Sequence, residues 1–195
     1  MNNNIILATT SKPRINAFKS LGIKFTHEDS KIDEKNLKRP KEPNKLVKYL
    51  ATLKAQSVSK NHMEGLVIGA DSIGLFKGKI LEKPASKREA FKRLKELSGK
   101  TCYLYTGVCI INIKDKKKVT KFLKTQINMR RISEKEINMY LHKYKSYSNY
   151  ALGFSTIDTL STTFIREIKG SYHNTISGLP LELIIQMLYS LGYNI

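Results

Sequence analysis

The sequence predicts an α/β protein in which at least part of the sheet is parallel. Along its 195 residues, short apolar segments rich in β-branched residues alternate with segments of helical periodicity. Capping residues and glycines bound several of the helical segments. No internal repeat, heptad array or low-complexity linker interrupts the alternation, so we expect residues 1–195 to form a single domain with a substantial core.

The first half of the chain contains two predicted strands and two predicted helices before its central strand. They are a strand over residues 4–8, a helix over 14–21, a strand over 23–28 and a helix over 44–60. Gly22 is expected to end the first helix and Asn44 to cap the second. The stretch between them, residues 29–44, is predicted to be a charged loop because it carries two prolines and many ionisable side chains.

The second half continues the alternation with clearer boundary signals. The predicted order is a strand over 66–76, a turn at 77–79, a helix over 86–98, strands over 101–113 and 118–129, a helix over 133–143, a strand over 163–168 and a helix from 181. Ser86 with Glu89, and Ser133 with Glu136, have the spacing of capping boxes. The last helix is expected to bury five apolar side chains, Leu183, Ile184, Met187, Leu188 and Leu191.

The composition indicates a soluble cytoplasmic protein with a basic surface. The net charge is +19, but the lysines are scattered apart from "KDKKK" at 114–118, and no stacking-aromatic module accompanies them. We therefore expect no specific nucleic-acid partner, although the positive field favours polyanionic substrates. The apolar runs are too short to span a membrane, and the N-terminus does not resemble a signal peptide.

The two cysteines are predicted to be core thiols. Cys102 and Cys109 lie on one predicted strand, seven positions apart, so their side chains point to opposite faces of the sheet. That geometry excludes a disulfide between them.

Lys54 is the strongest local anomaly in the sequence. It falls near the centre of the apolar stripe of the predicted helix over 44–60, a stripe made by Leu46, Val47, Leu50, Ala51 and Val58. A lysine at such a position either extends past the stripe to water or turns its ammonium towards a polar cleft.

Acidic residues and a second lysine raise the same question elsewhere. Asp71 comes at or near the end of the continuously apolar run "LVIGA", where a carboxylate either shapes a turn or serves as a general base or metal ligand. Asp33 and Glu34 are either solvated loop residues or oxygen ligands for magnesium. Lys83, in "ILEKP", would by itself be read as an exposed loop lysine.

The segment "LATTSKPRINAF", residues 7–18, has the composition of an anion site. A strand, a hydroxyl-rich loop that includes Ser11, and a helix start place N–H groups and the positive helix end together. Pro13 suits the first helical position, and Arg14 offers a planar fork for phosphate. The glycines of a Walker loop are missing, so that class of nucleotide site is excluded.

Taken together, these segments resemble the Maf family of nucleoside triphosphate pyrophosphatases. The matching pieces occur in the family's order and span nearly the whole chain. They are "ILATTSKPR" at 6–14, "IDE" at 32–34, "LATLKA" at 50–55, "GADS" at 69–72, "LEKP" at 81–84, "LSGKT" at 97–101, "TGV" at 106–108, "FIREIKGSY" at 164–172 and "GLPLELI" at 178–184.

The resemblance implies a mixed central sheet flanked by helices, with two lobes and a cleft. It implies hydrolysis of a nucleoside triphosphate to a monophosphate and pyrophosphate with a divalent metal, Mg²⁺ or Mn²⁺. By position, Asp71 matches the catalytic base and a metal ligand, and Glu34 matches an acidic position near the metal. Ser11, Arg14, Lys54 and Lys83 match the phosphate-binding positions.

Three departures from the family pattern concern the choice of base. Pro13 replaces an arginine, Ser72 replaces the threonine after the catalytic acid, and Asp158 stands where a glutamine is usual. The resemblance associates these positions with base selection, so a preference for dTTP or UTP does not carry over directly. Ser72 and Asp158 are accordingly candidate substrate contacts, and a carboxylate at 158 would accept hydrogen bonds from guanine or cytosine.

Two other functions remain open from the sequence. The substitutions are compatible with a catalytically weak relative that binds nucleotide or nucleic acid as a regulator through its basic surface. An inosine-triphosphate pyrophosphatase of similar architecture is a third reading, which the "ATTSKPR" opening fits less well. The oligomeric state is undecided, and a homodimer is left open.

Overall fold

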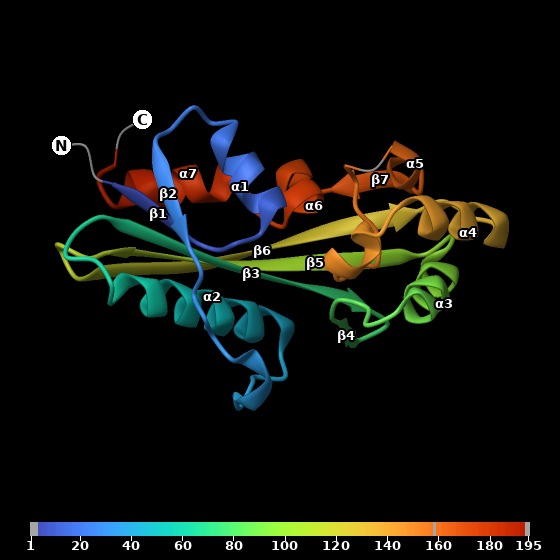
Figure 1. Ribbon diagram of the computed structural model, residues 1–195, viewed down its shortest axis with the longest axis horizontal. Coiled ribbons are helices and arrows are strands. Elements are labelled where there is room, and N and C mark those ends of the chain that lie inside the picture. The colour runs from blue at the N-terminus through green and yellow to red at the C-terminus, as the bar shows by residue number, and fades with distance from the viewer. Residues whose placement is uncertain (1–3, 158, 194–195) are drawn as a thin grey trace. The chain divides into compact units, whose positions relative to one another are not determined.

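The structure is a computed structural model that describes residues 4–157 and 159–193, and it is a mixed α/β fold (Figure 1). The strands are β1 (Ile5–Ala8), β2 (Phe25–Glu28), β3 (Leu66–Phe76), β4 (Lys79–Leu81), β5 (Thr101–Asn112), β6 (Lys117–Met129) and β7 (Ile165–Lys169). The helices are α1 (Lys12–Lys19), α2 (Pro43–Ser59), α3 (Lys87–Leu97), α4 (Glu134–Lys143), α5 (Thr159–Thr162), α6 (Tyr172–Ser177) and α7 (Leu181–Ser190), with 3₁₀ turns η1 (Glu34–Asn36) and η2 (Ser146–Asn149).

The seven strands form one sheet of mixed direction. Its order is β2-β1-β3-β5-β6-β7, and β4 pairs with β3 beside that path. β1 runs parallel to both β2 and β3, whereas the β3–β4 and β6–β7 pairs are antiparallel. The predicted α/β class with a partly parallel sheet is therefore confirmed.

The chain separates into two compact units. Unit 1 consists of residues 1–72, 106–123 and 177–195, and unit 2 consists of residues 73–105 and 124–176. The long strands β3, β5 and β6 each contribute residues to both units.

Unit 1 has helices on both faces of its strands (Figure 1). On one face α2 packs through small side chains, Ala51 and Ala55, against Ile6 and Val67. On the other face α1 and α7 cover an apolar cluster that includes Phe18, Ile68 and Ile184. Because neighbouring residues of a strand point to opposite faces, even-numbered residues in the unit 1 part of β3 face α1 and α7, and odd-numbered ones face α2.

Two glycines allow α2 to lie directly on the sheet. A Cβ at Gly69 would come within 2.3 Å of the Ala51 carbonyl oxygen, and one at Gly107 within 2.2 Å of the Val47 carbonyl oxygen. Real Cβ atoms never approach backbone so closely, so any larger residue at 69 or 107 must push the helix away. Lys54 lies on this tightly seated helix.

Unit 2 has its own apolar core and two capped helices. The core includes Leu94, Leu104, Tyr140 and Phe164. In α3 the Ser86 hydroxyl accepts from the Glu89 N–H, but the Glu89 carboxylate accepts from Ala85 rather than from Ser86. The capping box of α4 is complete. One predicted capping box is thus confirmed in full and the other in half.

The largest errors in the predicted elements are at helix starts and in short helices. α1 spans residues 12–19 rather than 14–21, which puts Pro13 second in the helix instead of first. α2 begins at Pro43 with Glu42 as its N-cap, so the predicted cap at Asn44 is wrong; a proline needs no partner for an N–H at the first helical position. The short helices α5 and α6 and the 3₁₀ turns η1 and η2 were not predicted from the sequence.

Other predicted features of the core are confirmed. Cys102 and Cys109 are buried free thiols, and burial raises the pKa of Cys102 to about 12. In α7, Ile184, Met187 and Leu188 are buried, whereas Leu183 and Leu191 are only partly so. Across the described residues, we find no helix that combines the length and the apolar character needed to cross a membrane.

Candidate active site

Asp71 lies inside strand β3 rather than at its end. β3 continues for five residues beyond it to Phe76, because the strand is apolar on both sides of the aspartate. The Asp71 side chain is 11% exposed. Its odd-numbered position turns the carboxylate to the face of the sheet that α2 covers.

The Lys54 ammonium lies between two carboxylates. Its Nζ is 2.5 Å from Oδ1 of Asp71 and 2.7 Å from Oε1 of Glu34, which begins η1. The Lys54 side chain is 15% exposed. The lysine therefore does not extend past the apolar stripe to water, and the anomaly in the sequence is explained by an ion-paired cluster of three side chains.

Arg14 approaches the same part of β3 from helix α1. Its guanidinium donates three hydrogen bonds: from Nη1 to the Ala70 carbonyl oxygen at 2.7 Å, from Nη2 to the Ser72 hydroxyl at 3.0 Å, and from Nε to the Gly178 carbonyl oxygen at 3.2 Å. Arg14 thereby joins the start of α1, the middle of β3 and the turn before α7. The planar fork has two further N–H groups.

The Ser72 hydroxyl is the centre of a second set of contacts in unit 1. Besides Arg14, it contacts the Thr106 hydroxyl at 2.8 Å and the Gly178 carbonyl oxygen at 3.2 Å. Thr106 is completely buried on β5. Gly178 has φ of +67°, a left-handed conformation that favours glycine and aims its carbonyl at Arg14 and Ser72.

The electrostatics of the site follow from burial and from the paired charges. Burial raises the pKa of Asp71, and the nearby charges of Lys54 and Arg14 act in the opposite direction. Burial lowers the pKa of Arg14, against the effects of Asp71 and Glu34. An arginine stays protonated at any physiological pH, so the cluster holds two cations and two carboxylates.

The donor set fits a divalent metal that shares its coordination with a substrate. No group of three or more His, Cys, Asp or Glu side chains in residues 4–157 and 159–193 forms a complete metal site. Glu34 and Asp71 nevertheless bring two carboxylates to one point. Mg²⁺ is commonly held by one or two carboxylates, with substrate phosphates and water completing the octahedron.

The structure brings five of the predicted site residues together in unit 1. Arg14, Glu34, Lys54, Asp71 and Ser72 form one connected set within unit 1. Ser11 is the N-cap of α1, and its hydroxyl makes no capping bond. Lys83 belongs to unit 2, where it is exposed between β4 and α3. Asp158 lies outside the described residues.

Of the acidic pair in the charged loop, Glu34 contacts Lys54 and Asp33 contacts Asn36. The Asp33 carboxylate accepts a hydrogen bond from Asn36 at 2.6 Å. This contact lies within η1 and the residue before it, so it stabilises the turn that presents Glu34.

Thr106 and the carbonyls of Ala70 and Gly178 were missed as site residues. "TGV" and "GLPLELI" contribute to the family resemblance, but no local pattern assigns a contact to either. The signal available was a threonine and a glycine inside otherwise apolar segments. Their partner, Ser72, lies 34 and 106 positions away along the chain.

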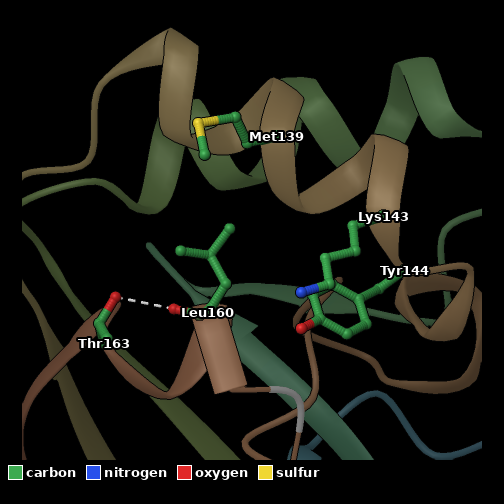
Figure 2. A pocket seen from close by; sticks show the side chains of 5 residues that line it. All are labelled: Met139, Lys143, Tyr144, Leu160 and Thr163. Carbon is green, nitrogen blue, oxygen red and sulfur yellow. Dashed lines mark hydrogen bonds between the residues drawn. The ribbon is translucent and has the colours of Figure 1, made fainter.

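A hollow in unit 2 is lined mainly by apolar surface and shares no residue with this cluster (Figure 2). It has a volume of about 380 Å³ and is lined by residues of α4 and α5 and their flanks, Met139, Lys143, Tyr144, Leu160 and Thr163. Thr163 donates a hydrogen bond to the Leu160 carbonyl oxygen at 2.7 Å. With one ammonium and no carboxylate in its lining, the hollow lacks an acid for hydrolysis.

The comparisons with known proteins identify the family. A family model described as "Maf-like protein" matches residues 4–191. The chain belongs to the Maf family. A Maf relative from Thermosipho melanesiensis named dTTP/UTP pyrophosphatase is 38% identical, covering 95% of this chain and 96% of its own. A Synechococcus relative named nucleoside triphosphate pyrophosphatase is 34% identical, covering 98% and 95%.

A solved structure outside the close relatives supports the fold of this Maf protein. The structure of a HAM1 protein from Coxiella burnetii matches with a TM-score of 0.50 at 16% identity, over 96% of this chain and 99% of that one. At this identity the similarity concerns the fold alone.

Proposed function

We propose that this Maf protein hydrolyses nucleoside triphosphates to nucleoside monophosphates and pyrophosphate, with Asp71 as the general base. The observation that carries the proposal is the meeting of Arg14, Glu34, Lys54 and Asp71 in one unit. The names of the relatives support the same reaction class. They favour it over a regulator without catalytic activity.

The cations of the site suit the charge of a triphosphate. The Lys54 ammonium and the Arg14 guanidinium would attract its phosphates and offset the charge that develops on the pyrophosphate leaving group. Ser11, with a hydroxyl not used for capping, and the N-terminal end of α1 would add donors on the same side as Arg14. We also assign a phosphate-binding role to Lys83, which belongs to unit 2.

Asp71 would activate the attacking water. Its carboxylate takes a proton from water while the water oxygen attacks the α-phosphorus; the bond from that phosphorus to the bridging oxygen breaks, and pyrophosphate departs with the electron pair. The raised pKa of Asp71, caused by burial, makes it a stronger base than an exposed aspartate.

A divalent ion, Mg²⁺ or Mn²⁺, would be held by Glu34 and Asp71. When bound, such an ion would supply positive charge that neutralises part of the charge of the phosphates. Before it arrives, Lys54 balances the two carboxylates and keeps them together.

The base preference and the setting of the enzyme complete the proposal. Asp158 and Pro13 differ from the family pattern, and we assign base selection to Asp158, whose carboxylate accepts hydrogen bonds from guanine or cytosine. We place the enzyme in the cytoplasm with a nucleotide as its partner, acting as a single domain of 195 residues.

Pyrophosphate release tests the proposal directly. Wild-type protein with Mg²⁺ or Mn²⁺ is assayed on UTP, dTTP, CTP, GTP, ATP and ITP, alongside Asp71→Asn. The amide cannot take the proton, so turnover is expected to fall by about 10²- to 10⁴-fold on every substrate. Circular dichroism should show an unchanged fold.

A matched control makes the same Asp→Asn change outside the site. Asp115→Asn makes the same change in the exposed turn between β5 and β6, where Asp115 contacts Asn112, and is expected to leave the rate unchanged. Equal rates for wild type and Asp71→Asn would remove Asp71 from the mechanism. Equal wild-type rates on UTP and GTP would refute base selection by Asp158.

A further inference from the structure

The Ser72 hydroxyl has no hydrogen-bonding capacity left for a substrate. A hydroxyl donates one hydrogen bond and accepts two. Ser72 Oγ has three protein partners: the Arg14 Nη2 group at 3.0 Å, the Thr106 hydroxyl at 2.8 Å and the Gly178 carbonyl oxygen at 3.2 Å. The number of partners equals the capacity of the group.

The chemistry of the partners fixes the direction of each bond. Arg14 only donates, and the Gly178 carbonyl only accepts. Ser72 therefore accepts from Arg14 and donates to Gly178. The remaining lone pair accepts the proton of the buried Thr106 hydroxyl, whose side-chain partner within the described part of the chain is Ser72. In this arrangement the one donor and the two acceptor sites of the Ser72 hydroxyl are all in use.

Arg14 holds the two residues that flank Asp71. Nη1 binds the Ala70 carbonyl and Nη2 binds the Ser72 hydroxyl, so one rigid guanidinium spans the aspartate along β3. Ser72 points to the face of α1 and α7, and Asp71 points to the face of α2, where Lys54 meets it. The carboxylate is thus held by its own ion pair on one face and by its neighbours' bonds on the other.

We propose that Ser72 is a positioning residue for Asp71, acting through Arg14 and supported by Thr106, and that it does not select the base. The inference rests on the proposed function and deepens it. It separates Ser72 from Asp158, to which base selection was assigned. Removing the Ser72 hydroxyl would leave an Arg14 N–H and the Thr106 hydroxyl without their partner, which loosens the strand at the reacting acid.

The decisive measurement is the ratio of rates between bases. In Ser72→Ala, kcat is expected to fall by about tenfold on every nucleotide of the panel, because a misplaced acid slows all of them equally. KM is expected to change by less than about twofold, since the change affects the reacting group and not the base contact. The ratio of UTP to GTP turnover should stay at its wild-type value.

Conservative variants separate positioning from mere destabilisation. Ser72→Thr keeps the hydroxyl, so its kcat should stay at the wild-type value, unlike that of Ser72→Ala. Thr106→Val keeps the shape of the buried side chain and leaves Ser72 in place, so it should fold even if Ser72→Ala does not, and should lower kcat by about threefold on all nucleotides. Ser57→Ala is the control, because Ser57 donates to the Ser30 carbonyl at 2.7 Å in the same unit, away from this network. It should keep wild-type kcat.

Each outcome bears on the proposal. An equal loss of kcat on all nucleotides, restored by threonine, supports it. A changed UTP-to-GTP ratio in Ser72→Ala, or unchanged kcat in both Ser72→Ala and Thr106→Val, would overturn it while the pyrophosphatase activity stands. Absence of turnover in the wild type would overturn this inference together with the proposed function.

Discussion

Two lysine–carboxylate pairs of equal length have different environments in the two units. In unit 1, Lys54 Nζ lies 2.5 Å from Asp71, and the side chains are 15% and 11% exposed. In unit 2, Lys95 Nζ lies 2.5 Å from Glu134, and the side chains are 60% and 59% exposed. The two pairs have the same distance and differ in the exposed fraction of their side chains.

The difference shows why the buried pair is a candidate for function. An exposed pair contributes about 0–1 kcal/mol because water and salt screen it. A buried pair costs desolvation free energy that its attraction only partly returns, and packed apolar side chains would often be more stable in its place. A chain that keeps two carboxylates and two cations in unit 1 has retained charges that stability does not require.

Replacing each lysine in turn should give the largest difference between the two pairs. Lys54→Met removes a cation that would contact the triphosphate, and kcat/KM is expected to fall by about 100-fold or more. It also leaves Asp71 and Glu34 without the ammonium that pairs with both, which should lower the free energy of unfolding by up to about 3 kcal/mol. Pyrophosphate release and urea denaturation measure the two effects.

Lys95→Met is the matched control in unit 2. It should leave turnover unchanged and alter the free energy of unfolding by no more than about 0.5 kcal/mol. Similar losses of activity in the two variants would show that burial does not separate these pairs.

The pKa values of two carboxyls sharpen the contrast between the units. Burial holds the pKa of Asp71 above its ordinary value of 3.8, whereas hydrogen bonds from Arg130 and Ser133 lower that of Glu136 to about 2. Carbon NMR of the side-chain carboxyls in metal-free protein should show the two midpoints displaced in opposite directions. A midpoint for Asp71 at or below 3.8 would contradict its description as a buried, strengthened base.

Glu136 gives the smallest effect, and its pH dependence follows from the sign of its shift. Because folding lowers the pKa of Glu136, its ionised form stabilises the protein above about pH 4.5, and this stabilisation disappears as pH falls towards about 2. Glu136→Gln weakens the capping box and should reduce the free energy of unfolding by about 1 kcal/mol at pH 7.

Denaturation at several pH values checks this sign. The difference between wild type and Glu136→Gln should shrink steadily below pH 4.5. Glu64→Gln, at an exposed loop position before β3, is the control and should show no such trend. A difference that grows on acidification would mean that Glu136 is not the anchored carboxylate described above.

The predictability of the fold depends on how local each signal is. The strands β3, β5 and β6 and the capping box at Ser133 are predictable because they follow from short-range pattern and chemistry. The start of α2 was misplaced because proline and asparagine both favour helix N-termini, and proline prevailed. α5 and α6 are too short for helical periodicity to show.

The site residues also differ in whether a local sequence signal marks them. Lys54 and Asp71 stood out because each violates the apolar pattern of its own segment, and the structure pairs them. Glu34 was proposed as a metal ligand, and its ion pair with Lys54 was not foreseen. The Ser72 network was missed because its members are ordinary in their local context and meet only through tertiary folding.

The missing Cβ atoms of Gly69 and Gly107 affect the position of Lys54 relative to β3. Gly69 and Gly107 lie against the backbone of α2, and because they have no side chain the helix lies directly on the strands. The close approach of α2 to β3 places the residue that carries the ammonium near the strand that carries Asp71, and the two groups lie 2.5 Å apart. Alanine at either glycine would push α2 away from the strands and so change the distance between Lys54 and Asp71, although neither residue is the one replaced.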